Sequence, residues 1–188
     1  MNSTNTSQNI NAIKPKVRIV HLPSYLEEPV IDELVRGNLL GALTTVGRAQ
    51  APACLKMWHD KGIVSDEQLR SVLLHIWSLA EYPCRELPRR CWLDWFRRAG
   101  YLSDIPGPRP TEQTEVWRAQ AGRVLGLSWT VDEDKAVWFH NRNILMQHEN
   151  PRLLHGIVQP EGILAITDDR DESEVVCDPA FVKLIATA

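Results

Sequence analysis

The sequence predicts an α+β protein in which an N-terminal helical region precedes a small β-sheet domain. Residues 27–100 carry apolar positions spaced as in amphipathic helices, whereas residues 115–177 contain short β-branched and aromatic runs separated by turns. The proline-rich segment 105–110 separates these two patterns, because each proline fixes its own backbone and favours an extended preceding residue. We therefore expect a helical region at 16–104 and a sheet region at 111–188.

The composition is typical of a globular protein and excludes several other classes. Of the 188 residues, 44% are hydrophobic and 24% are charged, so most of the chain should fold. The net charge of -3 gives no overall positive field toward nucleic acid or anionic membranes, although a local basic patch is compatible with it. Residues 1–15, rich in Ser, Thr, Asn and Gln, are expected to form a flexible tail rather than a signal peptide. No window approaches the roughly 20 apolar residues that span a bilayer, so we expect a cytoplasmic protein without a membrane partner.

The cysteines and histidines do not form a metal-binding pattern. The four cysteines lack CxxC spacing, and the six histidines form no HExxH-like cluster. We expect reduced, structural thiols and no metal.

The first helices are predicted from proline and glycine positions. Pro29 fits the first turn of a helix that Gly37 can end. A second helical segment, 39–59, should be broken or kinked near Pro52.

The third helix has the clearest start signal. Ser65 is an N-cap candidate, and Gln68 stands where the partner of a capping box is required. One apolar stripe follows, which predicts the face that packs in the core: Leu69, Val72, Leu73, Ile76, Trp77 and Ala80.

A fourth helix is predicted from Pro88 to Ala99, with Gly100 as its stop. Its aromatic stripe is typical of a core face. Several arginines lie on or beside it, and the sequence leaves open whether they form a solvated face or a patch for phosphate, nucleic acid or an acidic protein. These are Arg85, Arg89, Arg90, Arg97 and Arg98.

The C-terminal region is predicted to contain short strands and one helix. The helix should cover 132–141, with an apolar face that includes Ala136, Val137, Trp138 and Phe139. The predicted strands are 115–118, 126–130, 153–158, 162–167 and 174–177.

Three segments in this region carry side chains suited to one kind of chemistry. Arg118 ends a strand, Ser128 and Thr130 alternate on another, and Glu172 and Glu174 lie two residues apart before a Val-Val run. A guanidinium suits phosphate oxygens, and a carboxylate can stabilise an oxocarbenium-like ribose. Each segment alone also fits an ordinary strand end or an acidic loop, so the prediction depends on their combination and order.

In that order and setting, the three segments resemble those of the NAD-dependent mono-ADP-ribosyltransferases, in the Arg-Ser-Glu branch that includes many bacterial toxins. The resemblance covers residues 115 to about 179 and nothing in the helical first half. It implies a split β-sheet with NAD bound as a substrate. It also implies transfer of ADP-ribose to a macromolecular acceptor, protein or nucleic acid, with release of nicotinamide. An NAD glycohydrolase and a non-catalytic interaction protein are the alternative functions.

The resemblance also implies residue roles. Arg118 would hold a phosphate or ribose of NAD, and Ser128 would bind on the ribose side and orient the catalytic glutamate. Thr130 would support this arrangement and cap the following helix, for which Asp132 competes. Glu174 would bind the nicotinamide ribose and stabilise the cation that develops on it, while Glu172 would orient or deprotonate the acceptor. The helix that carries Trp138 and Phe139 would pack against the nicotinamide, and Trp129 should point away from the cleft.

Overall fold

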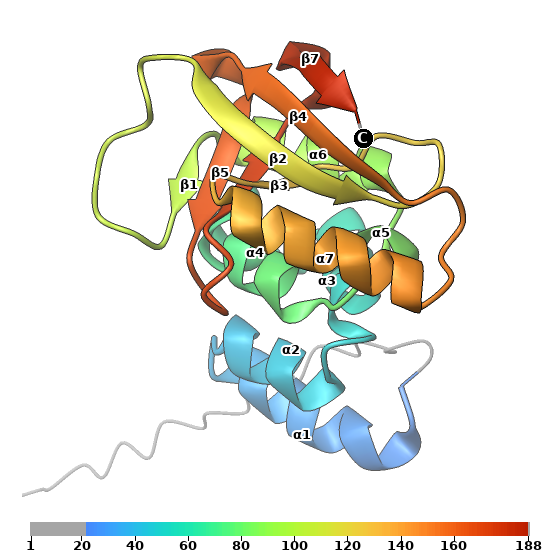
Figure 1. Ribbon diagram of the computed structural model, residues 1–188. Coiled ribbons are helices and arrows are strands. Elements are labelled where there is room, and N and C mark those ends of the chain that lie inside the picture. Colours follow the sequence, from blue (N-terminus) through green and yellow to red (C-terminus); the bar gives the residue numbers. More distant parts are fainter. Residues whose placement is uncertain (1–21, 188) are drawn as a thin grey trace, which may run out of the picture. The chain divides into compact units, whose positions relative to one another are not determined.

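The computed structural model describes residues 22–187, and the chain divides into two compact units between Val46 and Gly47. The described part of the first unit contains helix α1 (Ser24–Val35) and helix α2 (Leu39–Val46), shown in blue in Figure 1. Gly37 lies in the turn between them with a φ of 76°, so the predicted helix end is confirmed. The predicted start is wrong, because α1 begins five residues before Pro29 and contains this proline. The predicted tail at 1–15 lies outside the described residues.

The second unit begins with a turn and helix α3 (Ala51–Asp60). Gly47, with a φ of 89°, starts the turn that separates the helical stretches predicted as one segment at 39–59. Pro52 lies in the first turn of α3, where its missing N–H removes no helical hydrogen bond. The predicted break is therefore confirmed, and it precedes the proline.

Helix α4 (Asp66–Leu79) begins and packs as predicted. The Ser65 hydroxyl accepts a hydrogen bond from the backbone N–H of Gln68, and the Gln68 side chain accepts one from the N–H of Ser65 (3.2 and 2.9 Å). All six residues of the predicted stripe are buried. The polar cap and the apolar stripe thus fix both the start of α4 and its buried face.

Two further helices complete the helical part: α5 (Pro83–Glu86) and α6 (Arg89–Ala99), which ends at Gly100 with a φ of 72°. Trp92 and Phe96 of α6 make edge-to-face contacts with Trp77 of α4, with ring centroids 5.1 and 5.4 Å apart. Trp77, Trp92 and Phe96 are buried, so the aromatic stripe belongs to the core.

Several of the arginines considered as a surface patch make contacts within the unit. Arg97 donates two hydrogen bonds, of 2.9 and 2.6 Å, to the buried carboxylate of Asp178. Arg89 donates to the backbone carbonyl of Leu125, and Arg98 pairs with Asp94 one helical turn away. These contacts favour a structural role for part of the cluster. The four cysteines are free thiols.

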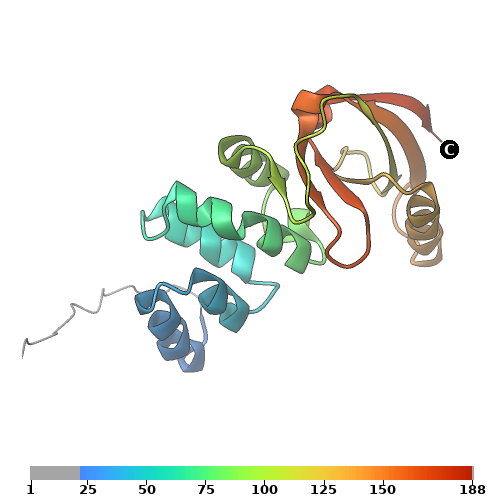
Figure 2. The same ribbon diagram turned by 90° about the vertical axis from the view of Figure 1, so that its left-hand side faces the viewer.

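A mixed sheet follows the helices (Figures 1 and 2). Its strands lie in the order β1-β5-β6-β3-β2-β4-β7. Among the strands of residues 22–187, only β1 and β5 pair in parallel. The α+β class and the five predicted strands are confirmed, whereas β1 and β7 were not predicted. Because β1 precedes segment 105–110, the sheet begins before that connector. The strands are β1 (Leu102–Ser103), β2 (Thr114–Gln120), β3 (Ser128–Thr130), β4 (Arg152–Val158), β5 (Ile163–Thr167), β6 (Glu174–Cys177) and β7 (Val182–Thr187).

The sheet is weakly joined at its centre. Strands β2 and β3 pair only at Trp117 and Thr130, whereas β2 pairs with β4 along its whole length and β3 with β6 along its whole length. The sheet therefore has two halves, β1-β5-β6-β3 and β2-β4-β7, which separate on either side of this single residue pair. Helix α7 (Glu133–Leu145) follows β3 directly and contacts both β2 and β3.

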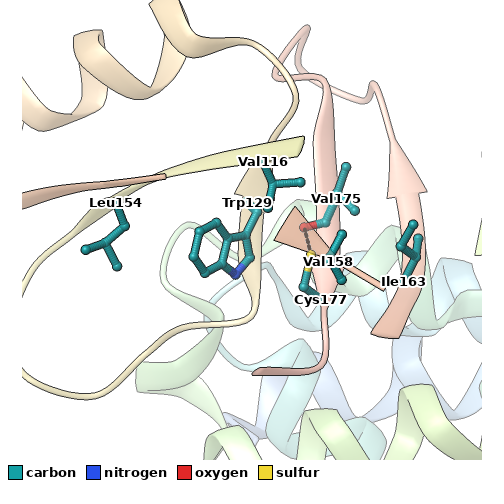
Figure 3. Close-up of a cluster of buried hydrophobic side chains, with 7 residues drawn as sticks. All are labelled: Val116, Trp129, Leu154, Val158, Ile163, Val175 and Cys177. Carbon is teal, nitrogen blue, oxygen red and sulfur yellow. Dashed lines mark hydrogen bonds between the residues drawn. The ribbon is translucent and has the colours of Figure 1, made fainter. Parts of the chain in front are cut away.

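A hydrophobic cluster fills the space under both halves of the sheet (Figure 3). Trp129 is 2% exposed and packs in this cluster. Because side chains alternate along a strand, its burial turns Ser128 and Thr130 to the opposite face. Trp129 thus packs on the face opposite Ser128 and Thr130, although the residue also borders the pocket described below. The cluster comprises Val116, Trp129, Leu154, Val158, Ile163, Val175 and Cys177.

Candidate functional site

A pocket of about 360 Å³ lies where β2 and β3 separate. Its volume is within the range of small-molecule sites. One wall comes from the end of α4 and from α5, another from α7, and the loop 168–173 before β6 completes it. The structure brings six of the seven predicted site residues into the pocket lining: Arg118, Ser128, Thr130, Phe139, Glu172 and Glu174.

Glu174 is the most enclosed charged group of the pocket, with only 4% of the residue exposed. It lies opposite Thr130 in the β3–β6 pairing, and its Oε1 accepts a 2.9 Å hydrogen bond from the indole N–H of Trp77. Burial raises the pKa of Glu174, because a low-dielectric environment disfavours the charged form, while hydrogen bonds from Ser128 and Trp77 act in the opposite direction. The site therefore holds a desolvated carboxylate that has fixed hydrogen-bond donors.

Arg118 lies on β2 with its guanidinium beside Gly126. A side chain at Gly126 would overlap the guanidinium, since an added Cβ would lie 2.1 Å from an Arg118 nitrogen. Arg118 Nε donates a 2.8 Å hydrogen bond to Gln120, and Nη1 donates to the backbone carbonyl of Ser128. Burial lowers the pKa of Arg118, and the negative charge of Glu174 opposes this shift. The hydrogen bonds to Gln120 and to the Ser128 carbonyl thus fix the orientation of the Arg118 guanidinium beside β3.

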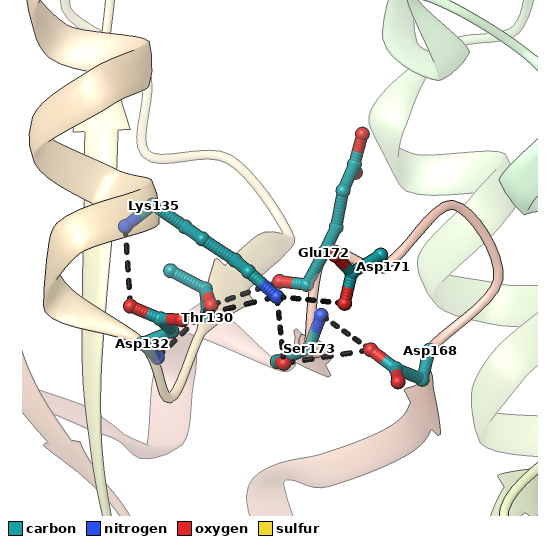
Figure 4. A network of polar contacts seen from close by, with 7 residues as sticks. All are labelled: Thr130, Asp132, Lys135, Asp168, Asp171, Glu172 and Ser173. Atoms are coloured by element: carbon teal, nitrogen blue, oxygen red, sulfur yellow. Dashed lines mark hydrogen bonds and ion pairs between the residues drawn. The ribbon is translucent and has the colours of Figure 1, made fainter.

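Loop 168–173 carries Glu172 and is closed by polar contacts (Figure 4). The carboxylate of Asp168 accepts a hydrogen bond from the Ser173 backbone N–H (3.0 Å). Lys135 of α7 reaches Asp171 and Ser173, at 3.3 and 3.2 Å. Three loop residues adopt positive φ values, which favour glycine: Arg170, Asp171 and Ser173. Contacts from α7 and from the loop's own side chains therefore hold the loop in a strained conformation.

The Glu172 side chain is about a quarter exposed and pairs with Arg170 at 3.1 Å. Burial raises its pKa, and the positive charges of Arg170 and Lys135 lower it. Its backbone carbonyl accepts a 3.0 Å hydrogen bond from the Thr130 hydroxyl, which itself accepts one from the N–H of Asp132. Thr130 thus connects β3 to the loop, while Asp132 is the N-cap of α7 through the N–H of Lys135.

The two predicted aromatic residues of α7 lie in different environments. Phe139 lines the pocket, together with Arg142 and Met146 further along the helix. Trp138 is 59% exposed and does not line it. The prediction that both would border the cleft is therefore not supported by the geometry for Trp138.

Among the residues that line or support the pocket and were not predicted from sequence are Trp77, Gln120 and Arg142. Trp77 was assigned only to the core, because its position in an apolar stripe gives no sign that its N–H meets Glu174. Gln120 is 1% exposed, and its side-chain oxygen accepts hydrogen bonds from Arg118 and from the N–H of Gly126. Its spacing of two residues from Arg118 on one strand could have indicated this contact. Arg142 lines the pocket together with Arg85, Arg118 and Arg170.

Comparisons with protein-family models, curated proteins and solved structures found no match to this chain. Among residues 22–187, no group of three or more His, Cys, Asp or Glu side chains is arranged to hold a metal ion. The helices of the same part of the chain are too short or too polar to cross a membrane.

Proposed function

We propose that this protein is an NAD-dependent ADP-ribosyltransferase that transfers ADP-ribose to a macromolecular acceptor and releases nicotinamide. The observation that carries the proposal is the convergence of Arg118, Ser128, Glu172 and Glu174 on one pocket. These residues come from strands β2, β3 and β6 and from the loop before β6, and they meet where the sheet is joined by a single residue pair.

The residues of the pocket fit the chemical parts of NAD. Its pyrophosphate is a dianion, which the guanidinium groups of Arg118 and Arg142 can bind. Its nicotinamide is a flat ring, for which Phe139 offers an apolar surface. Ser128, which lines the pocket, offers a hydroxyl to the ribose.

Glu174 is suited to the step that breaks the nicotinamide bond. As nicotinamide leaves, positive charge develops on the ribose, and a preorganised carboxylate in a desolvated site stabilises such charge strongly. The N–H of Trp77 holds the carboxylate in place before substrate binds. Glu174 is therefore assigned to NAD cleavage.

Glu172 is suited to the step that follows. It lies two residues from Glu174 and is more exposed, so it faces the part of the pocket that an acceptor can reach. A carboxylate there can take the proton that a nucleophile loses when it attacks the ribose. Glu172 is therefore assigned to the acceptor.

The test uses NAD labelled on its adenylate part, incubated with the purified protein in the presence and absence of cell lysate. Protease and nuclease treatments of the products then separate protein from nucleic-acid acceptors. The proposal expects label on lysate material with wild type and none with Glu174→Gln. Glu161→Gln removes an exposed carboxylate outside the pocket and is the matched control, which should label as wild type does.

The products also distinguish the alternatives. Free ADP-ribose as the sole labelled product would show an NAD glycohydrolase. Absence of nicotinamide release by the wild type would reject the proposal, as would wild-type release by Glu174→Gln.

A further inference from the structure

An arginine of the protein itself forms an ion pair with Glu172, the residue that we assign to the acceptor. The Arg170 guanidinium lies 3.1 Å from Glu172 Oε2, and both side chains line the pocket that contains Glu174. The Arg170 side chain is 42% exposed, so it is not locked in the protein interior. Its position is that of a nucleophile beside a base, within the same pocket as the carboxylate assigned to NAD cleavage.

The other arginines of the pocket are placed differently. Arg118 donates to Gln120 and to the Ser128 carbonyl. Arg85 lies over the ring of Tyr82, and Arg142 lies near the ring of Trp138. Among the pocket arginines in the described part of the chain, Arg170 alone pairs with Glu172.

The backbone of the loop keeps Arg170 beside Glu172. Arg170 and Asp171 both have positive φ values, 75° and 54°, which turn the chain back between the two side chains. Such conformations cost about 1–3 kcal/mol each and persist only where surrounding contacts impose them. Here Asp171 is held at its backbone by Asp168 and at its side chain by Lys135. An exposed pair of this kind adds little stability by itself, so the strained turn is imposed by the contacts of Asp171 and not by the Arg170–Glu172 pair.

A guanidinium can act as a nucleophile only if it loses a proton as it attacks. Glu172 is positioned to accept that proton, and the burial that raises its pKa makes it a stronger base than an exposed glutamate. The pairing therefore supplies both the nucleophile and the base for one transfer.

We propose that Arg170 is a self-modification site, at which the protein attaches ADP-ribose to its own guanidinium in cis; this rests on the proposed function. In the reaction, a bond forms between an Arg170 Nη atom and C1′ of the nicotinamide ribose, and the bond from C1′ to the nicotinamide nitrogen breaks. The bonding electron pair leaves with nicotinamide, which becomes neutral. The guanidinium proton passes to Glu172 and then to solvent, so no further reactant is required.

The experiment incubates the full 188-residue protein alone with adenylate-labelled NAD, and measures nicotinamide release and label on the chain in the same samples. Peptide mass spectrometry then locates the modified residue. We expect label on Arg170, at a rate per chain that does not depend on protein concentration, as a reaction in cis requires.

Two variants sharpen this test. Arg170→Lys keeps the positive charge but removes the guanidinium, and should lower labelling of the chain about tenfold or more. Arg98→Lys changes a comparably exposed arginine that pairs with Asp94 outside the pocket, and should label as wild type does. Circular dichroism of both variants checks that they are folded, and the site located in the wild-type chain tests the proposal independently of them.

The outcomes separate this inference from the proposed function. Nicotinamide release without label on Arg170 would overturn self-modification and leave NAD cleavage standing. A labelling rate per chain that rises in proportion to protein concentration would overturn reaction in cis. Absence of nicotinamide release by the wild type would overturn both proposals.

Discussion

Strand β6 and the loop that precedes it each carry one glutamate of the pocket, and they hold these side chains in opposite ways. Glu174, on β6, is buried between two strands and accepts a hydrogen bond from the core residue Trp77. Glu172 is partly exposed on a loop with strained backbone angles and pairs with Arg170. The difference teaches that the pocket combines a carboxylate fixed by the core with a more accessible one on a loop, which is the division that the proposed function requires.

The largest effect on transfer alone is expected from Glu172→Gln. If Glu172 serves only the acceptor, this variant should lower ADP-ribose transfer about 100-fold or more, the usual contribution of a general base. Hydrolysis of NAD should continue, because Glu174 is unchanged. Chromatography of labelled NAD, ADP-ribose and modified acceptor measures both rates. An equal loss of transfer and hydrolysis would contradict the division of roles.

A smaller effect is expected from Trp77→Phe, which retains an aromatic ring and removes the N–H that Glu174 accepts. A hydrogen bond to a charged group contributes about 1.5–3 kcal/mol, and the lower end of this range corresponds to the loss of roughly tenfold in nicotinamide release that we expect. The pKa of Glu174 should rise further, because its charged form loses a donor. The acidic limb of the pH–rate profile should then move to higher pH.

The matched control is Trp92→Phe. Trp92 belongs to the same aromatic cluster, but its N–H donates to the Pro83 carbonyl. Its pH profile should coincide with that of wild type. A shift of the acidic limb in both variants would show a general packing effect instead of a specific contact with Glu174.

Loss of a loop contact should change the reaction rates less than loss of a contact of Glu174. Lys135→Met removes the contacts from α7 to Asp171 and Ser173. Exposed ion pairs contribute up to about 1 kcal/mol, so the ratio of transfer to hydrolysis should fall by a factor of about five at most. Lys61→Met, at an exposed lysine outside the pocket, is the control. If Lys135→Met lost as much NAD cleavage as Trp77→Phe, this would contradict the separate roles of the loop and of strand β6.

The smallest effect is on stability. The folded-state pKa of Glu174 is raised above its unfolded value, so the associated stability is complete below the unfolded pKa, about 4.3, and is lost as pH rises through the folded pKa. Glu174→Gln can still accept from Trp77 but carries no buried charge. Its Tm should therefore exceed that of wild type near neutral pH, and the difference should close on acidification. Melting curves that are equal at neutral pH would contradict a desolvated Glu174.

Much of the fold follows from local sequence signals. The capping box at Ser65, the stripe on α4 and five strands were predicted, because hydrophobic period and caps act within a few residues. Strand β1 has two residues, too few to show a period, and β7 forms one edge of the sheet. Pro29 misplaced the start of α1, since a proline that fits a first turn can also be accommodated inside a helix.

The site was predictable as a set of residues in order, but not as a set of contacts. The N–H of Trp77 meets a carboxylate 97 positions further along the chain, and no local pattern encodes such a contact. Trp138 and Phe139 are adjacent on a helix, where successive side chains point about 100° apart, so they need not face the same side. The sequence could not indicate that Phe139 would be the one to line the pocket.

The most direct test measures nicotinamide release from NAD by wild type, Glu172→Gln and Glu174→Gln under identical conditions. We expect release by wild type, continued release by Glu172→Gln, and a loss of about 100- to 1,000-fold in Glu174→Gln, the effect of removing one preorganised stabilising group. Release by Glu174→Gln at the wild-type rate would contradict the account.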